Sequence, residues 1–450
     1  MTRCRFALCL RLFGLGLLGV AAATVWSCAT PHSPAVSSPS PPPAAGSTPY
    51  FLLLSDIHLN DQRTQSAYGR HHDTGTDLWT SLQHEIARIL SSTNPPGFVL
   101  YLGDLPAHTD ADPTPDIPDD IGEVLAGLRA VVEAAPKPIP LLYLPGNNDS
   151  LDGDYCQFSD SRRDPEPPYT RDAGHARDWP LIHGPPCTRV GTASDACLLD
   201  PTHRLDGYYS AYPTRDRRLR VLALNTVMFN NSGYCSSWTD RAELGDQQLA
   251  WLEQQLGSAS ANDEKVIVAM HIPPGTSAYC DSSGSLVDKP MWDQVDQQNT
   301  FLEHIDRYRD TIVGVFTSHT HMDEIRILHG PRGPAELAIS APGISPNHGQ
   351  NPSFKFVQYD PSSWQIIGAT TRHVDRLPVS DPQDPSVWEH TYTFRDSYSC
   401  TATDTTLWDC AGRQSTDALY RGLEQTLFVK KTTPTCDVRV LLDVEYTGQR

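Results

Sequence analysis

Short apolar runs recur along this chain, and a polar cluster follows most of them directly. Seven runs have the length and β-branched content of buried strands, and they lie at 50–54, 98–102, 141–144, 219–224, 266–270, 312–316 and 337–339. Stretches with the apolar spacing of helices lie between several of these runs. Strands that alternate with helices predict an α/β domain, which we place at 50–380.

Three helical stretches inside this domain are marked by apolar residues that recur every three or four positions. They run through Leu82, Val124 and Leu252, and Gly257 stands where the third helix is expected to end. The stretch 150–215 lacks periodicity and is rich in Asp, Arg, Pro and Gly, so we interpret it as a long insertion held by cysteines. Residues 381–450 contain three cysteines and one helical pattern, which predicts a small C-terminal appendage.

The first residues have the pattern of an export signal, which we place at 1–27. Arg3, Arg5 and Arg11 precede an apolar run that is too short and too rich in small residues for a membrane span. Cys28 follows a small residue, as at a bacterial lipoprotein cleavage site, so lipidation of Cys28 and an ordinary cleaved signal both stay open. Residues 28–49 are rich in Pro and Ser and form a semi-rigid linker. We therefore expect an exported protein that is periplasmic, anchored to the outer membrane through a lipid on Cys28, or secreted.

The net charge indicates which partners the chain can bind, and the cysteine content indicates the compartment in which it folds. The formal net charge of −19 at pH 7 makes the chain a poor ligand for a nucleic-acid polymer. Eight cysteines follow Cys28, and an even number in an exported chain indicates disulfides. None of the eight stands in a CxxC pair, which argues against a zinc site built from cysteines.

Five polar clusters, each directly after an apolar run, carry the candidate chemistry. They are Ser55–His58, Gly103–His108, Gly146–Asp149, His271–Pro274 and Ser318–His321. Ligand sites in α/β sheets form beyond the carboxyl ends of strands, so these clusters are expected to converge in space. Each cluster alone has a plain structural explanation, such as a helix cap, a turn or a surface histidine. All five in this order make that explanation improbable.

The residue types in these clusters fit a site for two divalent metal ions. Carboxylates and neutral imidazoles suit zinc, manganese and iron, and zinc is the ion we expect. Asp56 and His58, two residues apart at a strand end, point to one side, and so do His319 and His321. Asp104 is the candidate carboxylate to bridge both ions. Two such ions clamp a phosphate and ionise a bridging water, so hydroxide is the nucleophile and no Ser or Cys is required.

The order Asp-x-His, Gly-Asp, Gly-Asn, His and His-x-His resembles that of the calcineurin-like metallophosphoesterase superfamily. Three segments resemble more narrowly acid sphingomyelinase and the sphingomyelinase-like phosphodiesterases, and they are Gly103–His108, Gln248–Leu256 and His271–Gly275. The resemblance covers about residues 50–360. It implies two packed mixed β-sheets flanked by helices, a four-layer sandwich. It also implies one metal on Asp56, His58, Asp104 and His321 and a second on Asp104, Asn147, His271 and His319.

One position departs from that family pattern. The family usually has a His after Gly-Asn, where it contacts the phosphate, and this chain has Asn148. An amide donates a hydrogen bond but transfers no proton, so Asn148 is expected to orient the phosphate. His108, which its motif places beside the bridging carboxylate, is the natural substitute for the acid that protonates the leaving group. Two roles stay open for His348, in the lining of the site or in a plain loop.

The sequence therefore predicts an exported, binuclear-metal phosphoesterase that hydrolyses phosphodiesters or related phosphate esters, with a lipid headgroup or a nucleotide as substrate. A nucleotide or phosphomonoester phosphatase is the alternative among enzymes. A catalytically impaired metal-binding surface protein is the alternative outside enzymes, and Asn148 motivates it. The complete set of predicted ligands argues against that second alternative.

The same resemblance implies a disulfide between Cys235 and Cys280, because sphingomyelinase-like enzymes have cysteines at matching places. Two local disulfides, Cys187–Cys197 and Cys400–Cys410, are then expected. That leaves Cys156 to pair with Cys436.

Overall fold

The computed structural model describes residues 48–448, with gaps at 160–167, 169–186, 188–195, 231–232, 234, 278, 280–286, 288 and 432–437. The predicted signal peptide, Cys28 and nearly all of the predicted linker lie outside the described residues. None of the described helices is both long and apolar enough to cross a membrane.

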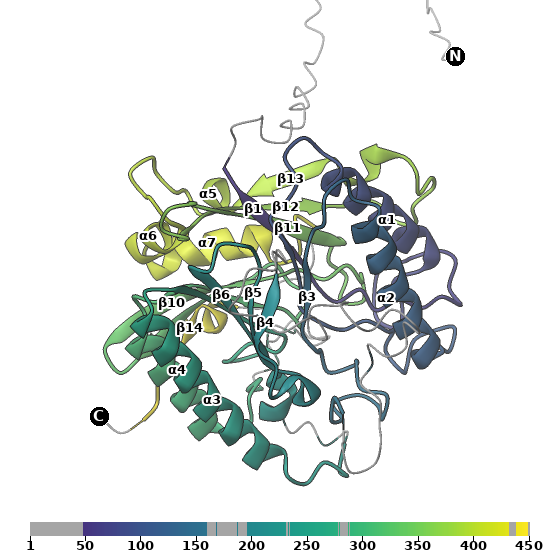
Figure 1. The fold of residues 1–450 in the computed structure, drawn as a ribbon. Helices are drawn as coiled ribbons and strands as arrows, with labels where there is room; N and C mark the ends of the chain where they lie inside the picture. The colour runs from purple at the N-terminus through teal and green to yellow at the C-terminus, as the bar shows by residue number, and fades with distance from the viewer. Residues whose placement is uncertain are drawn as a thin grey trace, which may run out of the picture. The chain divides into compact units, whose positions relative to one another are not determined.

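Two mixed β-sheets form the body of the protein (Figure 1). The first sheet contains, in spatial order among the described residues, β13 (His390–Thr393), β12 (Ile366–His373), β11 (Ser353–Tyr359), β1 (Tyr50–Leu54), β2 (Val99–Tyr101) and β3 (Leu141–Tyr143). The second contains β14 (Asp443–Val444), β9 (Ile325–Gly330), β10 (Gly333–Ser340), β8 (Ile312–Thr317), β7 (Lys265–Met270), β6 (Leu219–Leu224), β5 (Tyr209–Tyr212) and β4 (Cys197–Asp200).

Each sheet contains a set of neighbouring parallel strands. In the first sheet β1, β2 and β3 run parallel, and β11 joins β1 in the antiparallel direction. In the second sheet β6, β7, β8 and β10 run parallel. Antiparallel pairs join β4 to β5, β5 to β6 and β9 to β10, while β14 runs parallel to β9. The parallel strands of each sheet therefore bring their carboxyl ends to a common edge.

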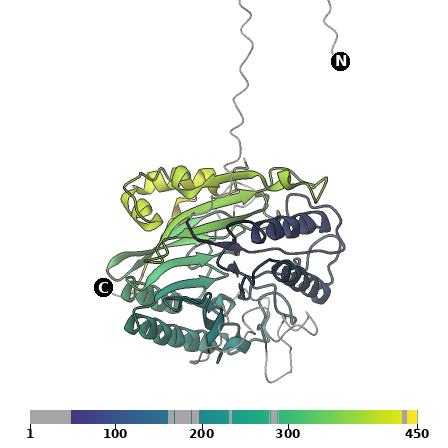
Figure 2. The ribbon, with the colours of Figure 1, turned by 45° about the horizontal axis from the view of Figure 1, so that its top comes forward.

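Helices cover the outer faces of the two sheets, which gives the expected sandwich (Figure 2). The helices α1 (Thr76–Leu90) and α2 (Ile117–Glu133) pack together beside the first sheet. The helices α3 (Arg241–Ala261) and α4 (Val295–Arg307) pack together beside the second. Alternate residues of β6 serve two cores, because Val221 and Ala223 join the core shared with the first sheet and Leu222 and Leu224 join the core with α3 and α4. Burial on both faces explains why these strands are continuous apolar runs.

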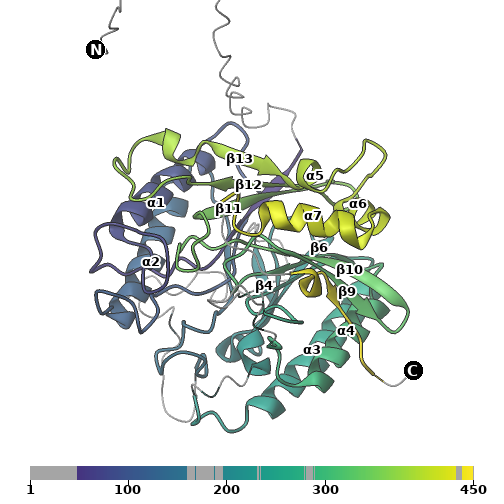
Figure 3. The ribbon, with the colours of Figure 1, turned by 180° about the vertical axis from the view of Figure 1, so that it is seen from behind.

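The C-terminal residues contribute to both sheets. The helices α5 (Phe394–Ser397), α6 (Leu407–Arg413) and α7 (Thr416–Thr426) lie together beside β12 (Figure 3). The same part of the chain adds β13 to the first sheet and β14 to the second. Short 3-10 turns complete the described structure at Arg204–Asp206, Thr226–Phe229, Pro385–Trp388 and Arg439–Leu441. The boundary at residue 380 between a catalytic domain and an appendage stays a prediction.

All seven predicted strands are present, and so are the predicted helices. The predicted helix end at Gly257 is wrong, because α3 continues to Ala261. Leu256 and Ala259 are both buried in the core with α4. Packing on both sides of the glycine therefore stabilises the helix beyond it. The insertion at 150–215 contains β4 and β5, which the absence of periodicity concealed. All four residues of β5 are buried, so no alternation of polar and apolar positions marks that strand.

Three disulfides link described cysteines, namely Cys156–Cys235, Cys187–Cys197 and Cys400–Cys410. The two local pairs were predicted and are confirmed. The predicted pairs Cys235–Cys280 and Cys156–Cys436 are wrong, because Cys156 and Cys235 bond to each other. Their Cα atoms are 5.1 Å apart since the turn before Cys156 folds back against the start of α3. Cys280 and Cys436 lie outside the described residues.

Candidate metal centre

The seven predicted ligands converge on one buried point between the sheets. Asp56 and His58 follow β1, Asp104 follows β2, and Asn147 follows β3. From the second sheet, His271 follows β7, and His319 and His321 follow β8. None of the seven is more than 8% exposed. The convergence arises because parallel strands bring the residues at their carboxyl ends to the same edge of each sheet.

The seven side chains form two groups that share Asp104. The Oδ2 atom of Asp104 lies 3.2 Å from the Nε2 atom of His58 and 3.2 Å from that of His271. The first group continues through His321, whose Nε2 atom is 3.2 Å from His58 Nε2 and 3.6 Å from Asp56 Oδ1. We call Asp56, His58 and His321 the first group.

The second group lies on the other side of Asp104 and consists of Asn147, His271 and His319. Its histidine His271 has its Nε2 atom 3.1 Å from the Oδ1 atom of Asn147 and 3.2 Å from the Nδ1 atom of His319. Oxygen and nitrogen lone pairs therefore converge on both sides of one carboxylate, as ligands for two divalent cations do.

A cation fits the first group for a further reason. Both carboxylate oxygens of Asp56 are buried and have no hydrogen-bond partner. A buried carboxylate without a partner is costly, and coordination of a cation removes that cost. Burial also raises the pKa of Asp56 to about 6, and a cation bound beside this carboxylate would favour its ionised form.

The backbone at five of the predicted ligands is strained. Asp56, His58, Asp104, His319 and His321 have φ between 45° and 72°, a region that non-glycine residues rarely occupy. Each such residue costs roughly 1–3 kcal/mol, and this kind of strain clusters at functional sites. The strain indicates that the rest of the fold holds these loops in place against their local preference.

The glycines of two motifs are required by close contact between loops. A Cβ atom on Gly103 would lie 2.2 Å from the backbone nitrogen of Gly146. A Cβ atom on Gly146 would lie 2.1 Å from the Oδ1 atom of Asp104. Asp149 closes this contact, because its carboxylate accepts hydrogen bonds from the backbone of Asp104, Leu105 and Gly146.

Backbone carbonyls orient three of the four predicted histidine ligands. The outer Nδ1 atoms of His58, His271 and His321 lie 2.9, 2.7 and 3.2 Å from the carbonyl oxygens of Pro106, Leu102 and Ser345, respectively. Such a partner fixes which nitrogen faces the metal. His319 is different, because its inner atom is Nδ1 and its outer Nε2 atom lies 3.3 Å from the Tyr155 hydroxyl.

At His319, His321 and Asp104, electrostatics favour the protonation states that metal ligands need. Burial, with His271 and His348 as neighbouring imidazoles, holds the pKa values of His319 and His321 well below the ordinary value. Burial opposes ionisation of Asp104, but His271 and His58 hold the pKa of that carboxyl well below its usual range. The pKa of His271 is raised to about 9, since Asp104 outweighs the effect of burial. A cation beside His271 would oppose that protonation.

His108 lies next to His58 of the first group, and a buried carboxylate holds it. Its Nδ1 atom lies 3.0 Å from the Oδ1 atom of Asp73, and its backbone nitrogen donates to Asp73 Oδ2. The ring stacks on His58 with centroids 4.0 Å apart. Burial would lower the pKa of His108, but Asp73 raises it to about 9. The side chain is 25% exposed, so a substrate can reach it.

Sequence analysis missed Asp73, which no motif marks. It is fully buried and also accepts hydrogen bonds from the Ser345 hydroxyl at 2.8 Å and from the Asn347 amide at 3.2 Å. Asp73 thus ties His108 to the loop that contains His348. That histidine lines the site, because its ring lies 4.7 Å from the ring of His321 and stacks on Tyr279 at 4.5 Å.

Asn148 contacts the shared carboxylate. Its side-chain amide donates to Asp104 Oδ2 at 3.0 Å, and its backbone nitrogen donates to Asp104 Oδ1 at 2.8 Å. A hollow of about 170 Å³ beside it is lined by Ala107, Thr109, Asn148 and Asp154, among others. Asn148 therefore contacts the shared carboxylate and also borders this hollow, which none of the seven predicted ligands lines.

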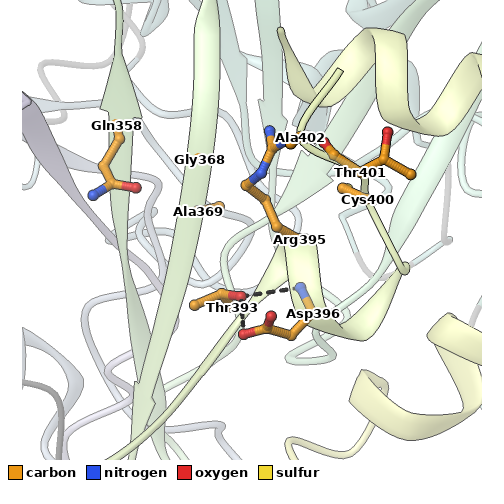
Figure 4. A pocket seen from close by; sticks show the side chains of 9 residues that line it. All are labelled: Gln358, Gly368, Ala369, Thr393, Arg395, Asp396, Cys400, Thr401 and Ala402. Carbon is orange, nitrogen blue, oxygen red and sulfur yellow. Dashed lines mark hydrogen bonds between the residues drawn. The ribbon is translucent and has the colours of Figure 1, made fainter. Parts of the chain in front are cut away.

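A larger hollow, of about 380 Å³, lies on the first sheet and includes none of the predicted site residues (Figure 4). It is lined by Gln358, Ala369, Thr393 and Arg395, among others. The guanidinium of Arg395 is already bonded to the carbonyl oxygens of Ile367, Thr401 and Asp404. The size of a hollow therefore does not locate the chemistry in this protein, whereas the convergent side chains do.

Comparisons with known proteins agree with this geometry. Residues 49–323 match the family model described as calcineurin-like phosphoesterase. The Homo sapiens protein named cyclic GMP-AMP phosphodiesterase SMPDL3A is 25% identical over 413 residues, which cover 83% of this chain and 81% of that protein.

The Homo sapiens sphingomyelin phosphodiesterase is 26% identical over 330 residues, which cover 71% of this chain and 47% of that protein. The Homo sapiens acid sphingomyelinase-like phosphodiesterase 3b is 26% identical over 216 residues, 45% of each chain. These matches span about half the length of the two relatives. A solved 5'-nucleotidase from Candida albicans gives a TM-score of only 0.32 at 11% identity, over 70% of this chain and 50% of that one.

Proposed function

This chain belongs to the calcineurin-like phosphoesterase family, and from that premise we propose that it is an exported, two-metal phosphodiesterase of the sphingomyelinase-like type. One observation carries the proposal. The Oδ2 atom of Asp104 stands 3.2 Å from one histidine of each group. A carboxylate shared in this way is suited to bridge two cations, and a mononuclear site would not need the second group.

Asp56, His58, Asp104 and His321 would hold one ion, and Asp104, Asn147, His271 and His319 the other. Bound divalent ions would supply a water nucleophile at neutral pH and offset the charge of the phosphate. His108 would donate a proton to the leaving oxygen, held in position by Asp73. Asn148, whose amide donates to the shared carboxylate, would orient the phosphate.

The substrate is proposed from the relatives. The relatives are named for cyclic GMP-AMP and for sphingomyelin, and both substrates are phosphodiesters. Charge compensation of the phosphate would rest on the metal ions and on His108.

Export is supported by the three disulfides between described cysteines, because such bonds persist in oxidising compartments. Zinc as the ion, and a lipid on Cys28, remain proposals that rest on the residue types and on the sequence pattern.

The test is a substrate panel on protein whose metal has been removed by chelation and then restored with zinc or manganese. The panel would contain bis-p-nitrophenyl phosphate, sphingomyelin, a cyclic dinucleotide and p-nitrophenyl phosphate. We expect two ions per chain by elemental analysis and faster turnover of diesters than of the monoester. Turnover after complete metal removal would overturn the metal mechanism. Two bound ions without turnover of any ester would favour the impaired surface protein.

A further inference from the structure

The two groups of predicted ligands have different outer contacts. In the first group, the outer nitrogens of His58 and His321 contact backbone carbonyls. In the second group, only His271 does so. Asn147 and His319 instead contact side chains from one turn, and these side chains belong to the consecutive residues Asp154 and Tyr155.

Asp154 determines which end of the Asn147 amide faces the centre. The Nδ2 atom of Asn147 donates to Asp154 Oδ1 at 2.7 Å, while its Oδ1 atom lies 3.1 Å from His271 Nε2. A carboxylate only accepts hydrogen bonds, so it selects the amide nitrogen. The oxygen, which is the atom that binds cations, is thereby turned inward.

Tyr155 contacts the outer nitrogen of His319, as Asp154 contacts the outer end of the Asn147 amide. The inner Nδ1 atom of His319 lies 3.2 Å from His271 Nε2, and its outer Nε2 atom lies 3.3 Å from the Tyr155 hydroxyl. The two rings meet edge to face with centroids 6.2 Å apart. An Nε2–H that donates to this hydroxyl leaves Nδ1 unprotonated and free to bind an ion.

The turn that carries both residues is anchored on two sides. The backbone nitrogen of Tyr155 donates to the Asn147 carbonyl at 2.8 Å, and its carbonyl accepts from Arg241 at 2.8 Å. Cys156, the next residue, is bonded to Cys235 ahead of α3. These anchors explain how a turn that is itself only partly buried holds two side chains on a buried centre.

We propose that Asp154 and Tyr155 are positioning residues that set the affinity of the second metal site alone. The proposal rests on the two-metal function above. It assigns a role to a segment for which the motifs of the sequence predict none.

The test measures the affinity for each of two zinc ions by competition with a chromophoric chelator on the full exported chain. Variants at both positions, Asp154→Ala and Tyr155→Phe, are compared with Asp152→Ala, an exposed acid in the same turn. Loss of an outer-shell partner typically costs about 10–100-fold in metal affinity. We expect Asp154→Ala to weaken one ion by about that factor, Tyr155→Phe to weaken it less, and Asp152→Ala to change neither.

Selective loss is the deciding readout, because general destabilisation would weaken both sites together. Equal weakening of both ions, or no weakening of either, would overturn the proposal. If Asp154→Ala does not fold, Asp154→Asn keeps the size of the side chain and an oxygen acceptor, and it should retain most of the affinity that Ala loses. Wild-type protein that binds only one ion would instead overturn the two-metal function itself, so the two failures are distinguishable.

Discussion

The two halves of the candidate centre are built differently. The first group leans on main-chain carbonyls of loops that leave the central strands, and the fully buried Asp73 supports His108 beside it. The second group depends on side chains of a partly buried turn that a disulfide joins to the start of α3. Main-chain contacts survive most substitutions, whereas side-chain contacts do not. Substitutions of single residues can therefore alter the support of the second half more readily than that of the first.

The difference coincides with the point where this chain departs from its family pattern. Asn148 replaces the usual histidine, and its amide contacts Asp104. The turn after Asn148 then supplies Asp154 and Tyr155.

Replacement of the shared carboxylate should affect both halves of the centre equally. It should have the largest effect on metal content and activity. Asp104→Asn loses the charge that both groups share, so both metal ions should be lost. Activity should fall by more than the roughly 10³-fold that loss of one electrostatic group costs. Elemental analysis and turnover of bis-p-nitrophenyl phosphate check this, with the exposed Asp417→Asn on α7 as the control. Retention of two ions at a normal rate would contradict the bridging role.

Loss of His108 should affect chemistry beside the first half without affecting metal content. General acid catalysis contributes about 10²–10⁴-fold, so His108→Ala should cost that much on an alkyl ester with a poor leaving group. The cost should be much smaller on a p-nitrophenyl ester, whose leaving group needs no proton.

Metal analysis is the necessary control for His108→Ala, because His58, His108 and His321 also lie close enough together to hold an ion. A lost ion, or equal losses on both esters, would make His108 a ligand or a structural residue and leave the acid unidentified.

Removal of the carboxylate behind His108 should give the same selectivity with a smaller effect. Asp73→Asn cannot accept from His108 as the carboxylate does, and a misplaced catalytic group costs up to about 10²-fold. Rates on alkyl and p-nitrophenyl esters should again separate. Ser345→Ala is the matched control, since it removes another hydrogen bond of Asp73 and leaves His108 in contact. Equal effects of the two variants would assign Asp73 to loop stability alone.

Restoration of the family histidine at Asn148, which contacts the carboxylate shared by the two halves, should have the smallest effect. Asn148→His returns an imidazole beside the phosphate and should raise turnover of alkyl esters a few-fold. The gain is limited because the amide that now donates to Asp104 is lost. Steady-state rates on alkyl and p-nitrophenyl esters, with metal content as control, measure this effect. A fall on alkyl esters with both ions retained would show that the amide contact matters more than a second acid.

Several features are determined by sequence alone, because they depend on local patterns. The strands are apolar runs, and each predicted ligand comes directly after one of them. Since parallel strands end at a common edge, local order along the chain is enough to predict that Asp56, Asp104 and His271 meet. The family resemblance then assigns the ligands to two groups. The seven strands and the two short-range disulfides were also predictable, because they too depend on residues close together in the sequence.

Only the tertiary structure decided the contacts between distant segments. The pairing of Cys156 with Cys235, the support of His108 by Asp73 and the contact of Tyr155 with His319 each join loops that no periodic pattern connects. Such contacts depend on how loops fold after the sheets have formed. The sequence around a single carboxylate, hydroxyl or thiol does not indicate which residue it contacts in the folded protein. The same residue types are common in solvated loops, where they have no such partner.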